Sequence, residues 1–256
     1  MHKICLIIPA HNEEKRIGKT LEEYCRFFNN KQKQKEIKNF KILVVINNTT
    51  DRTENIVKKS KKKCKKVDYL NFKKGGKGFA VIEGFKYALK NDFDLIGFVD
   101  ADFATPAVAY YELIKKIDHY DGAIASRYIR GSIVHPKPSW QRYFASRIFN
   151  ILIRSLLMMP YRDTQCGAKI FKKKALKNSI NLLSMSKWAF DVDILYNLRK
   201  KGYRIKEVPT MWSDKKYSKV NLGKCGLEMF LAIVRLRLLN SPFKGFIRIY
   251  ERLLQR

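Results

Sequence analysis

The first half of the chain alternates between short apolar runs, typical of strands, and longer segments whose apolar residues recur at helical spacing. The runs that we predict as strands are residues 3–8, 40–46, 67–72, 95–99 and 122–126. The segments that we predict as helices are residues 13–28, 53–64, 78–89 and 106–117. Strands that alternate with helices form a largely parallel sheet with helices on both faces. We therefore predict an α/β fold of this kind.

The second half carries a long apolar helix, predicted for residues 140–159. Its polar side chains fall within one arc of about 140° when the segment is wound at about 100° per residue. These side chains are Arg142, Ser146, Arg147, Asn150 and Arg154. A polar arc of this width predicts a helix with one polar face and one broad apolar face.

Shorter elements complete the chain. We predict strands at 168–171 and 204–208, a helix at 188–200, and amphipathic tail segments at 227–239 and 243–254. After the last predicted strand the pattern changes to amphipathic helical segments, which predicts that the chain is divided into two parts. Residues 1–222 would form the main domain, and residues 223–256 would form amphipathic helices that lie on a membrane or pack on that domain.

Four polar motifs follow predicted strands. They are "IPAHNE", "INNTTD", "KKGGKG" and "DADFAT". Ligands of open parallel sheets bind beyond the carboxyl ends of the strands. All four motifs should therefore meet at one ligand-binding edge.

Asp100 and Asp102 come directly after an apolar run and are two residues apart. In extended backbone both side chains would point to the same face, and two carboxylates there repel each other unless a cation lies between them. Mg²⁺ or Mn²⁺, shared with substrate phosphates, suits such a pair. The alternative is a turn before the next helix, with Thr105 as its cap.

Lys77 lies among Gly75, Gly76 and Gly78 at a predicted helix start. Glycines let the backbone approach a ligand, and helix N-termini favour anions. The spacing is not that of a Walker loop. Lys77 is thus a candidate for binding donor phosphates, and an ordinary turn is the alternative.

The motifs taken in order resemble one family. "IPAHNEE", "GGKGFAVIEGF", "DADFAT", "ASRY", "RDTQCGAKIF" and "WAFDVDILY" are similar to motifs of family 2 glycosyltransferases with the GT-A fold. The similarity is to the polyprenyl-phosphate subgroup, and "DTQCG" and "WAFDVD" resemble the dolichyl-phosphate β-glucosyltransferase branch. It spans residues 3 to 220. It implies a Rossmann-like GT-A domain and a metal-dependent hexosyltransferase.

The resemblance also implies roles for individual residues on the donor side. The residues expected to bind the nucleotide sugar are Pro9, Ala10, Glu13, Asn47, Asp51, Lys77, Asp100 and Lys219. Asp100 and Asp102 would bind the metal and the diphosphate. Asn47 replaces a family aspartate, and an amide can donate as well as accept hydrogen bonds, so altered base contacts are expected.

On the acceptor side, the resemblance places Arg127, Arg142 and Ser146 at the acceptor phosphate. Arg142 could instead be a solvated arginine of the helix face. Asp191 would orient the acceptor or a sugar hydroxyl, or it could simply be a carboxylate favoured near a helix N-terminus. Asp163 could bind sugar or fix a turn.

The implied reaction is inverting transfer of a hexose from a nucleotide sugar to a polyprenyl phosphate. UDP-glucose is favoured as donor, and GDP-mannose is the other option. A phosphate acceptor is already anionic and needs no strong base. An enzyme of the same family that acts on a sugar or glycan hydroxyl would need a general base, for which Asp191 is the candidate.

The net charge of +30 attracts polyanions. Nucleic-acid binding would require aromatic residues among the basic ones, and the lysine runs at 31–38 and 58–66 have almost none. An anionic membrane surface fits the charge better than nucleic acid does.

No apolar stretch is long enough to span a bilayer, and no signal peptide is recognisable. The five singly scattered cysteines argue against disulfides. We predict a cytoplasmic enzyme, peripheral on the cytoplasmic face of a membrane.

Overall fold

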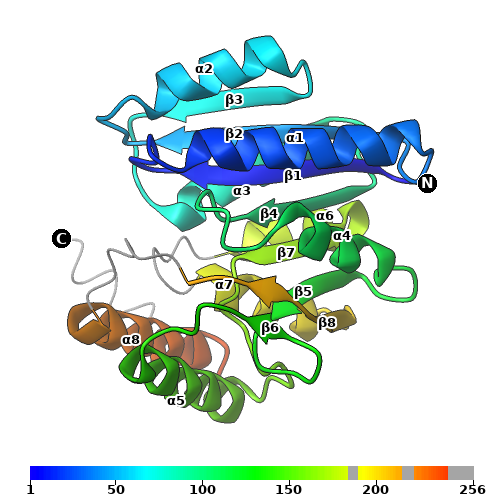
Figure 1. The fold of residues 1–256 in the computed structure, drawn as a ribbon. Coiled ribbons are helices and arrows are strands. Elements are labelled where there is room, and N and C mark those ends of the chain that lie inside the picture. The colour runs from blue at the N-terminus through cyan, green and yellow to red at the C-terminus, as the bar shows by residue number, and fades with distance from the viewer. Residues whose placement is uncertain (184–189, 215–221, 242–256) are drawn as a thin grey trace, which may run out of the picture.

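A computed structural model describes residues 1–183, 190–214 and 222–241, with the backbone alone at 222–229. The main strands are β1 (Lys3–Ala10), β2 (Asn39–Asn47), β3 (Val67–Phe72), β4 (Leu95–Val99), β5 (Gly122–Ser126), β7 (Ala168–Lys172) and β8 (Ile205–Pro209). They form one sheet in the order β3-β2-β1-β4-β7-β5-β8, in which only β7 runs antiparallel to its neighbours. The predicted mostly parallel α/β sheet is confirmed (Figure 1).

A small parallel ribbon of β6 (Ile133–Val134) and β9 (Met211–Trp212) stands apart from this sheet. The helices are α1 (Ile17–Lys33), α2 (Thr53–Lys63), α3 (Lys77–Lys90), α4 (Ala107–Lys115), α5 (Trp140–Leu157), α6 (Lys173–Ser179), α7 (Phe190–Lys200) and α8 (Leu222–Leu239), with a 3-10 turn at Ile180–Leu182. The sequence did not predict the ribbon or α6. Both are too short to show a clear hydrophobic period.

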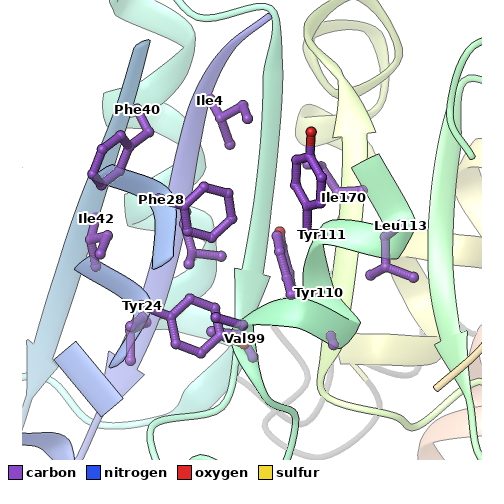
Figure 2. Packing of buried hydrophobic residues seen from close by; sticks show 14 of the residues in the cluster. Ile4, Tyr24, Phe28, Phe40, Ile42, Val99, Tyr110, Tyr111, Leu113 and Ile170 are labelled. Atoms are coloured by element: carbon purple, nitrogen blue, oxygen red, sulfur yellow. The ribbon is translucent and has the colours of Figure 1, made fainter. Parts of the chain in front are cut away.

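Alternating residues of the buried strands divide the core into two layers. On β1, Ile4 and Leu6 face the layer formed with α1, α2 and α4, whereas Cys5 and Ile7 face the layer formed with α3, α5, α6, α7 and α8. Figure 2 shows the first layer, where Tyr24 and Tyr110 lie edge to face. The inner part of the sheet is therefore buried on both sides, which explains why strands such as β1, β2 and β4 are almost continuous apolar runs.

The first helix begins later than predicted. The backbone N–H groups of Arg16 and Ile17 both donate to the carbonyl of Glu13, so residues 13–16 form a turn and α1 starts at Ile17. It also extends beyond residue 28 with polar, surface-facing residues that carry no hydrophobic signal. The early turn leaves Glu13 at the end of the sheet rather than on the helix.

Cys25 of α1 and Cys64, just after α2, form a disulfide. The expectation that the scattered cysteines stay unpaired is therefore wrong for these two. They are 39 residues apart in sequence, and only the side-by-side packing of α1 and α2 brings them together. Sequence spacing alone carries no sign of that proximity.

The C-terminal helix α8 begins five residues before its predicted start and packs against α5. Its Ile233 and Leu236 are buried in the same layer as Ile153 and Leu157 of α5. The predicted segment 243–254 lies outside the described residues. Within the described part of the chain, no helix has the length and apolar character that crossing a bilayer requires.

Candidate active site

A cleft of about 1300 Å³ opens at the carboxyl ends of the central strands. Its lining includes His11 after β1, Asn47 at the end of β2, Lys77 at the start of α3 and Asp100 after β4. A smaller cavity of about 190 Å³ shares these four residues and adds Pro9, Ala101 and Asp102. The predicted meeting of the four polar motifs at one edge is confirmed.

Asp100 and Asp102 both line the smaller cavity. The Asp100 backbone N–H donates to the carbonyl of Gly167, 3.1 Å away, which ties the end of β4 to the segment before β7. Oδ1 of Asp102 accepts from the Ala104 backbone N–H at 3.0 Å. Burial, together with the nearby charge of Asp100, raises the pKa of the Asp102 carboxyl above its usual range.

This pair fits a divalent cation. Two carboxylates that line one small cavity repel each other, which favours a cation between them. Among the residues that the structure describes, no group of three or more histidine, cysteine or acidic side chains gathers as a metal cluster. An ion held by these two carboxylates would have room for substrate oxygens among its ligands, as Mg²⁺ and Mn²⁺ sites do. Helix α4 begins after Pro106 without a side-chain cap, so Thr105 is not the helix cap that the alternative interpretation predicted.

Lys77 connects two carboxylates across the cleft. Its Nζ lies 2.8 Å from Oδ1 of Asp100 and 3.4 Å from Oδ2 of Asp191. Burial opposes its charge, but the two carboxylates outweigh burial and raise the pKa of Lys77. A protonated ammonium is thus fixed between Asp100 and Asp191 in the cleft. Binding of donor phosphates by Lys77 stays a prediction.

Asp191 is also bound by Lys169, a fully buried lysine of β7. The Lys169 ammonium donates to Oδ1 of Asp191 at 2.6 Å and to the carbonyl of Cys166 at 2.6 Å. Burial alone would raise the pKa of Asp191, but Lys169 and Lys77 lower it below its usual range. A carboxylate held ionised by two lysines is a poor proton acceptor.

Asn47 joins the loops of the donor side. Its Nδ2 donates to the carbonyl of Ala10 and its Oδ1 accepts from the Gly76 backbone N–H, both at 3.0 Å. The side chain is almost fully buried, although Asn47 still lines both cavities. The amide therefore fixes β1, β2 and the start of α3 relative to one another. A contact to the base stays a prediction.

The other donor-side residues lie at different depths. Pro9 lines the smaller cavity, Glu13 lines both, and Ala10 is buried behind them. Asp51 lines neither cavity, because its carboxylate accepts from Thr53 and from the Glu14 backbone N–H and fixes the turn before α2. Lys219 lies outside the described residues.

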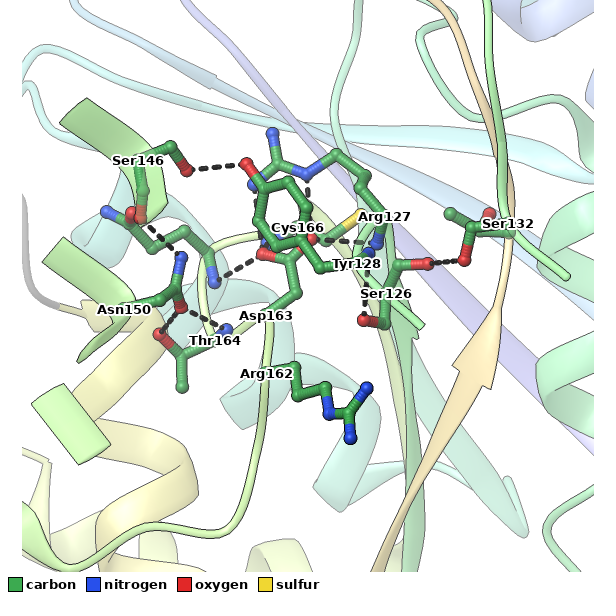
Figure 3. A network of polar contacts seen from close by, with 12 residues as sticks. Ser126, Arg127, Tyr128, Ser132, Ser146, Asn150, Arg162, Asp163, Thr164 and Cys166 are labelled. Carbon is green, nitrogen blue, oxygen red and sulfur yellow. Dashed lines mark hydrogen bonds and ion pairs between the residues drawn. The ribbon is translucent and has the colours of Figure 1, made fainter. Parts of the chain in front are cut away.

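Arg127 follows β5 and lines the cleft. Its Nε and Nη2 donate to the two oxygens of Asp163 at 2.7 and 2.9 Å, and its guanidinium lies 5.1 Å from the Trp212 ring centre. Asp163 is fully buried and also accepts from the backbone N–H of Cys166. Figure 3 shows this network. Asp163 thus fixes a turn and Arg127, the second of its two predicted roles.

Arg142 and Ser146, on the polar arc of α5, also line the cleft. Nη1 of Arg142 lies 2.9 Å from both oxygens of Asp214, so Arg142 is not a solvated arginine of an outer helix face. The Ser146 hydroxyl accepts from the Tyr128 hydroxyl at 2.7 Å. Three residues of the polar arc of α5, Arg142, Ser146 and Arg147, therefore line the cleft. Asn150 of the same arc is buried, and Arg154 is exposed outside the cleft.

Sequence reasoning missed Lys169, Asp214 and Tyr128. The position of Lys169 inside the apolar run "AKIF" was a sign of its role, since a charged side chain in a buried strand requires a partner. Asp214 and Tyr128 follow short or irregular segments and gave no signal.

A mostly parallel α/β sheet with paired carboxylates, a lysine and arginines around one cleft is the arrangement expected of a glycosyltransferase with the GT-A fold. The chain belongs to glycosyl transferase family 2, whose sequence model matches residues 5–180. It is 29% identical over 248 residues to dolichyl-phosphate beta-glucosyltransferase of Dictyostelium discoideum, covering 91% of this chain and 73% of that one. The human protein of the same name is 28% identical over 258 residues, covering 94% and 78%.

Solved structures agree on the fold. Glucosyl-3-phosphoglycerate synthase from Mycobacterium tuberculosis, in complex with Mn²⁺, UDP and phosphoglyceric acid, superposes with a TM-score of 0.64 at 12% identity, covering 93% of this chain and 78% of that one. S. aureus TarS 1–349 in complex with UDP superposes with a TM-score of 0.56 at 17% identity, covering 94% of this chain and 66% of that one. At these identities the similarity concerns the fold alone.

Proposed function

We propose that this glycosyltransferase transfers a hexose from a nucleoside diphosphate sugar to a polyprenyl phosphate of the dolichyl type. UDP-glucose is the favoured donor and GDP-mannose the other candidate. The relatives named dolichyl-phosphate beta-glucosyltransferase support this assignment. The observation that carries it is a single cleft lined both by Asp100 and Lys77 and by the arginines Arg127 and Arg142.

Asp100 and Asp102 would bind Mg²⁺ or Mn²⁺ together with the donor diphosphate. The ion would supply positive charge that stabilises the departing nucleoside diphosphate. Lys77 would remain protonated beside that diphosphate and donate to it. Lys219 is proposed to do the same from the segment outside the described residues. Glu13, Pro9, Ala10, Asn47 and Asp51 would shape the base and ribose site.

Arg127, Arg142 and Ser146 would orient the acceptor phosphate. Asp163 occupies one edge of the Arg127 guanidinium, which leaves the other edge of this five-donor group available. An acceptor phosphate near neutral pH is already anionic, so the protein's task is positioning and charge stabilisation. A single displacement at the anomeric carbon inverts its configuration and converts an α-linked donor into a β-linked product.

The alternative acceptor, a sugar or glycan hydroxyl, requires a general base. Asp191 is the candidate, but Lys169 and Lys77 lower its pKa and occupy its two oxygens. A base whose proton affinity is reduced in this way would be inefficient. The phosphate acceptor is therefore favoured.

The outer side of α5 supports a membrane location for the reaction. Trp140, Phe144, Ile148 and Ile151 are each more than half exposed, and of these four Trp140 alone also lines the cleft. An exposed aromatic and aliphatic face beside the cleft suits a helix that lies in a bilayer interface. We propose that residues 223–256 extend this surface beyond the transferase domain at 1–222, and that the enzyme lies on the cytoplasmic face of a membrane.

The test of the reaction offers UDP-glucose and GDP-mannose in turn, with Mg²⁺ or Mn²⁺, to a short polyprenyl phosphate. The matching polyprenol, which lacks the phosphate, is the control acceptor. We expect transfer to the phosphate alone, faster from UDP-glucose, and a β-linked product. Equal transfer to the polyprenol, or no transfer to the phosphate from either donor, would refute the proposal.

The membrane location has its own test, sedimentation with vesicles that contain anionic lipid. Replacing Trp140 and Phe144 by Ser should release protein into the supernatant. Val108→Ser, at an exposed valine of α4, is the matched control and should sediment like the unaltered protein. Equal sedimentation of both variants would place the contact elsewhere.

A further inference from the structure

Three arginine side chains line the cleft beside α5, namely Arg127, Arg142 and Arg147. Two of them already have a carboxylate partner. Arg127 is paired with Asp163, and Arg142 is paired with Asp214. The positive charge that these two arginines bring to the cleft is therefore largely balanced before any ligand binds.

Arg147 has a different environment. Its side chain is half buried, and its guanidinium carbon lies 4.9 Å from the centre of the Tyr128 ring. Across residues 1–183, 190–214 and 222–241, the structure records no hydrogen bond or ion pair of Arg147 with a carboxylate. A half-buried cation without such a counter-charge favours the binding of an anion.

Tyr128 is itself fixed in place. Its hydroxyl donates to Ser146 at 2.7 Å, and Figure 3 shows the tyrosine directed from the end of β5 toward that serine. Contact with an aromatic ring leaves the N–H groups of a guanidinium free to form hydrogen bonds. The guanidinium carbon of Arg127 lies 5.2 Å from the centre of the same ring, so Tyr128 contacts two arginines. Of these two, Arg127 is the one paired with Asp163.

We propose that Arg147 binds the phosphate of the acceptor and supplies the uncompensated charge that selects a phosphate over a hydroxyl. This inference rests on the proposed function. The donor diphosphate would have its own cation, Lys77, which lies beside Asp100. Next to Arg147 on α5, Trp140 and Tyr143 line the cleft and are also exposed, which suits an acceptor whose phosphate continues into a hydrocarbon chain.

The experiment measures the binding of farnesyl phosphate by calorimetry, with farnesol, inorganic phosphate and UDP as separate ligands. Arg147→Gln is compared with Arg154→Gln, which removes the same charge from an exposed position of the same helix that does not line the cleft. We expect Arg147→Gln to bind farnesyl phosphate about tenfold to a hundredfold more weakly, the loss of a charge-assisted hydrogen bond. Binding by Arg154→Gln should be unchanged, and Arg147→Lys should be intermediate.

Each arm of the experiment has a definite meaning. Farnesol should bind weakly and equally to all variants, and the variants should bind UDP with unchanged affinity. If inorganic phosphate alone shows the same Arg147-dependent affinity, the site recognises the phosphate group and gains little from the chain. If Arg147→Gln weakens UDP rather than farnesyl phosphate, Arg147 serves the donor and the proposal is overturned.

Failure of the proposed function would look different. An unaltered protein that binds farnesyl phosphate in an Arg147-dependent manner, yet transfers no sugar to it, would refute the proposed reaction and retain the anion site. An unaltered protein that does not bind farnesyl phosphate, or an Arg147→Gln variant that binds it equally well, would overturn the role of Arg147.

Discussion

The ammonium group of Lys77 lies 2.8 Å from Oδ1 of Asp100, where α3 begins and β4 has just ended. Through Asp191, 3.4 Å from the same ammonium, this pair is connected to the buried Lys169. Two carboxylates and two lysines thus alternate from the floor of the cleft into the core. The arrangement fixes Asp100 and places a permanent positive charge beside it.

Lys77→Gln should weaken donor binding. The variant removes a cation placed to contact the diphosphate, and we expect KM for the nucleotide sugar to rise about tenfold to a hundredfold. Lys73→Gln, at an exposed lysine of the preceding loop, is the matched control and should leave KM unchanged. Steady-state kinetics with the donor varied provide the measurement. An unchanged KM in Lys77→Gln would show that this lysine only stabilises the fold.

Asp191→Asn should destabilise the protein more than it impairs the chemistry. It leaves Lys169 buried without its carboxylate, which costs about 3–5 kcal/mol in the free energy of unfolding. Adding Lys169→Met should recover part of that loss, because the two residues are coupled. Denaturant unfolding measures both effects. Turnover with a phosphate acceptor, assayed at low temperature, should persist, and its complete loss in a folded variant would instead favour Asp191 as a base.

Gly167→Ala should disturb the metal site without unfolding the chain. A Cβ at Gly167 would lie 1.8 Å from Oδ2 of Asp100, so the carboxylate must move aside. We expect weaker Mn²⁺ binding and lower turnover with a nearly unchanged melting temperature. Gly18→Ala, whose Cβ would meet only the Ile56 side chain at 3.3 Å, is the control. Full activity of Gly167→Ala would show that the position of Asp100 is not critical.

Asp163 predicts a pH dependence of stability. Burial would raise the pKa of its carboxyl, but Arg127 and the surrounding N–H groups lower it below its usual range. The unfolded chain therefore binds a proton more readily, and the stabilisation is present above about pH 4 and is lost as the pH falls through the folded pKa.

Asp163→Asn should accordingly be less stable at neutral pH, and its free energy of unfolding should fall less between about pH 5 and pH 3 than that of the unaltered protein. Urea titrations across this range measure the difference. Parallel pH profiles for the two proteins would mean that the Arg127 pair contributes nothing to folding.

The sequence predicted the sheet well because its strands are buried on both faces. Runs such as residues 95–99 and 122–126 were bounded correctly, since an apolar run ends where the sheet edge meets water. The antiparallel direction of β7 was not predicted. Direction depends on how the chain returns to the sheet, and that is decided by packing rather than by local pattern.

The candidate site was predicted in part. Asp100, Lys77 and Arg127 lie in one cleft because parallel strands bring their carboxyl ends together. The partners of these residues could not be predicted in the same way. Asp214 meets Arg142 across 72 residues, and Cys25 meets Cys64 across a helix interface, so both contacts depend on tertiary packing. Asp51 matched a family position, yet its carboxylate faces its own turn rather than the cleft.

Mn²⁺ binding in the presence and absence of UDP, followed by electron paramagnetic resonance of the free ion, tests the role of Asp100 and Asp102 most directly. Asp102→Asn is compared with Asp118→Asn, an equal charge change at an exposed position. We expect Asp102→Asn to weaken Mn²⁺ binding by more than the roughly tenfold effect of an outer-shell change, and chelation to stop turnover. Equal Mn²⁺ affinity in both variants, with turnover that resists chelation, would contradict a metal-dependent transferase at this site.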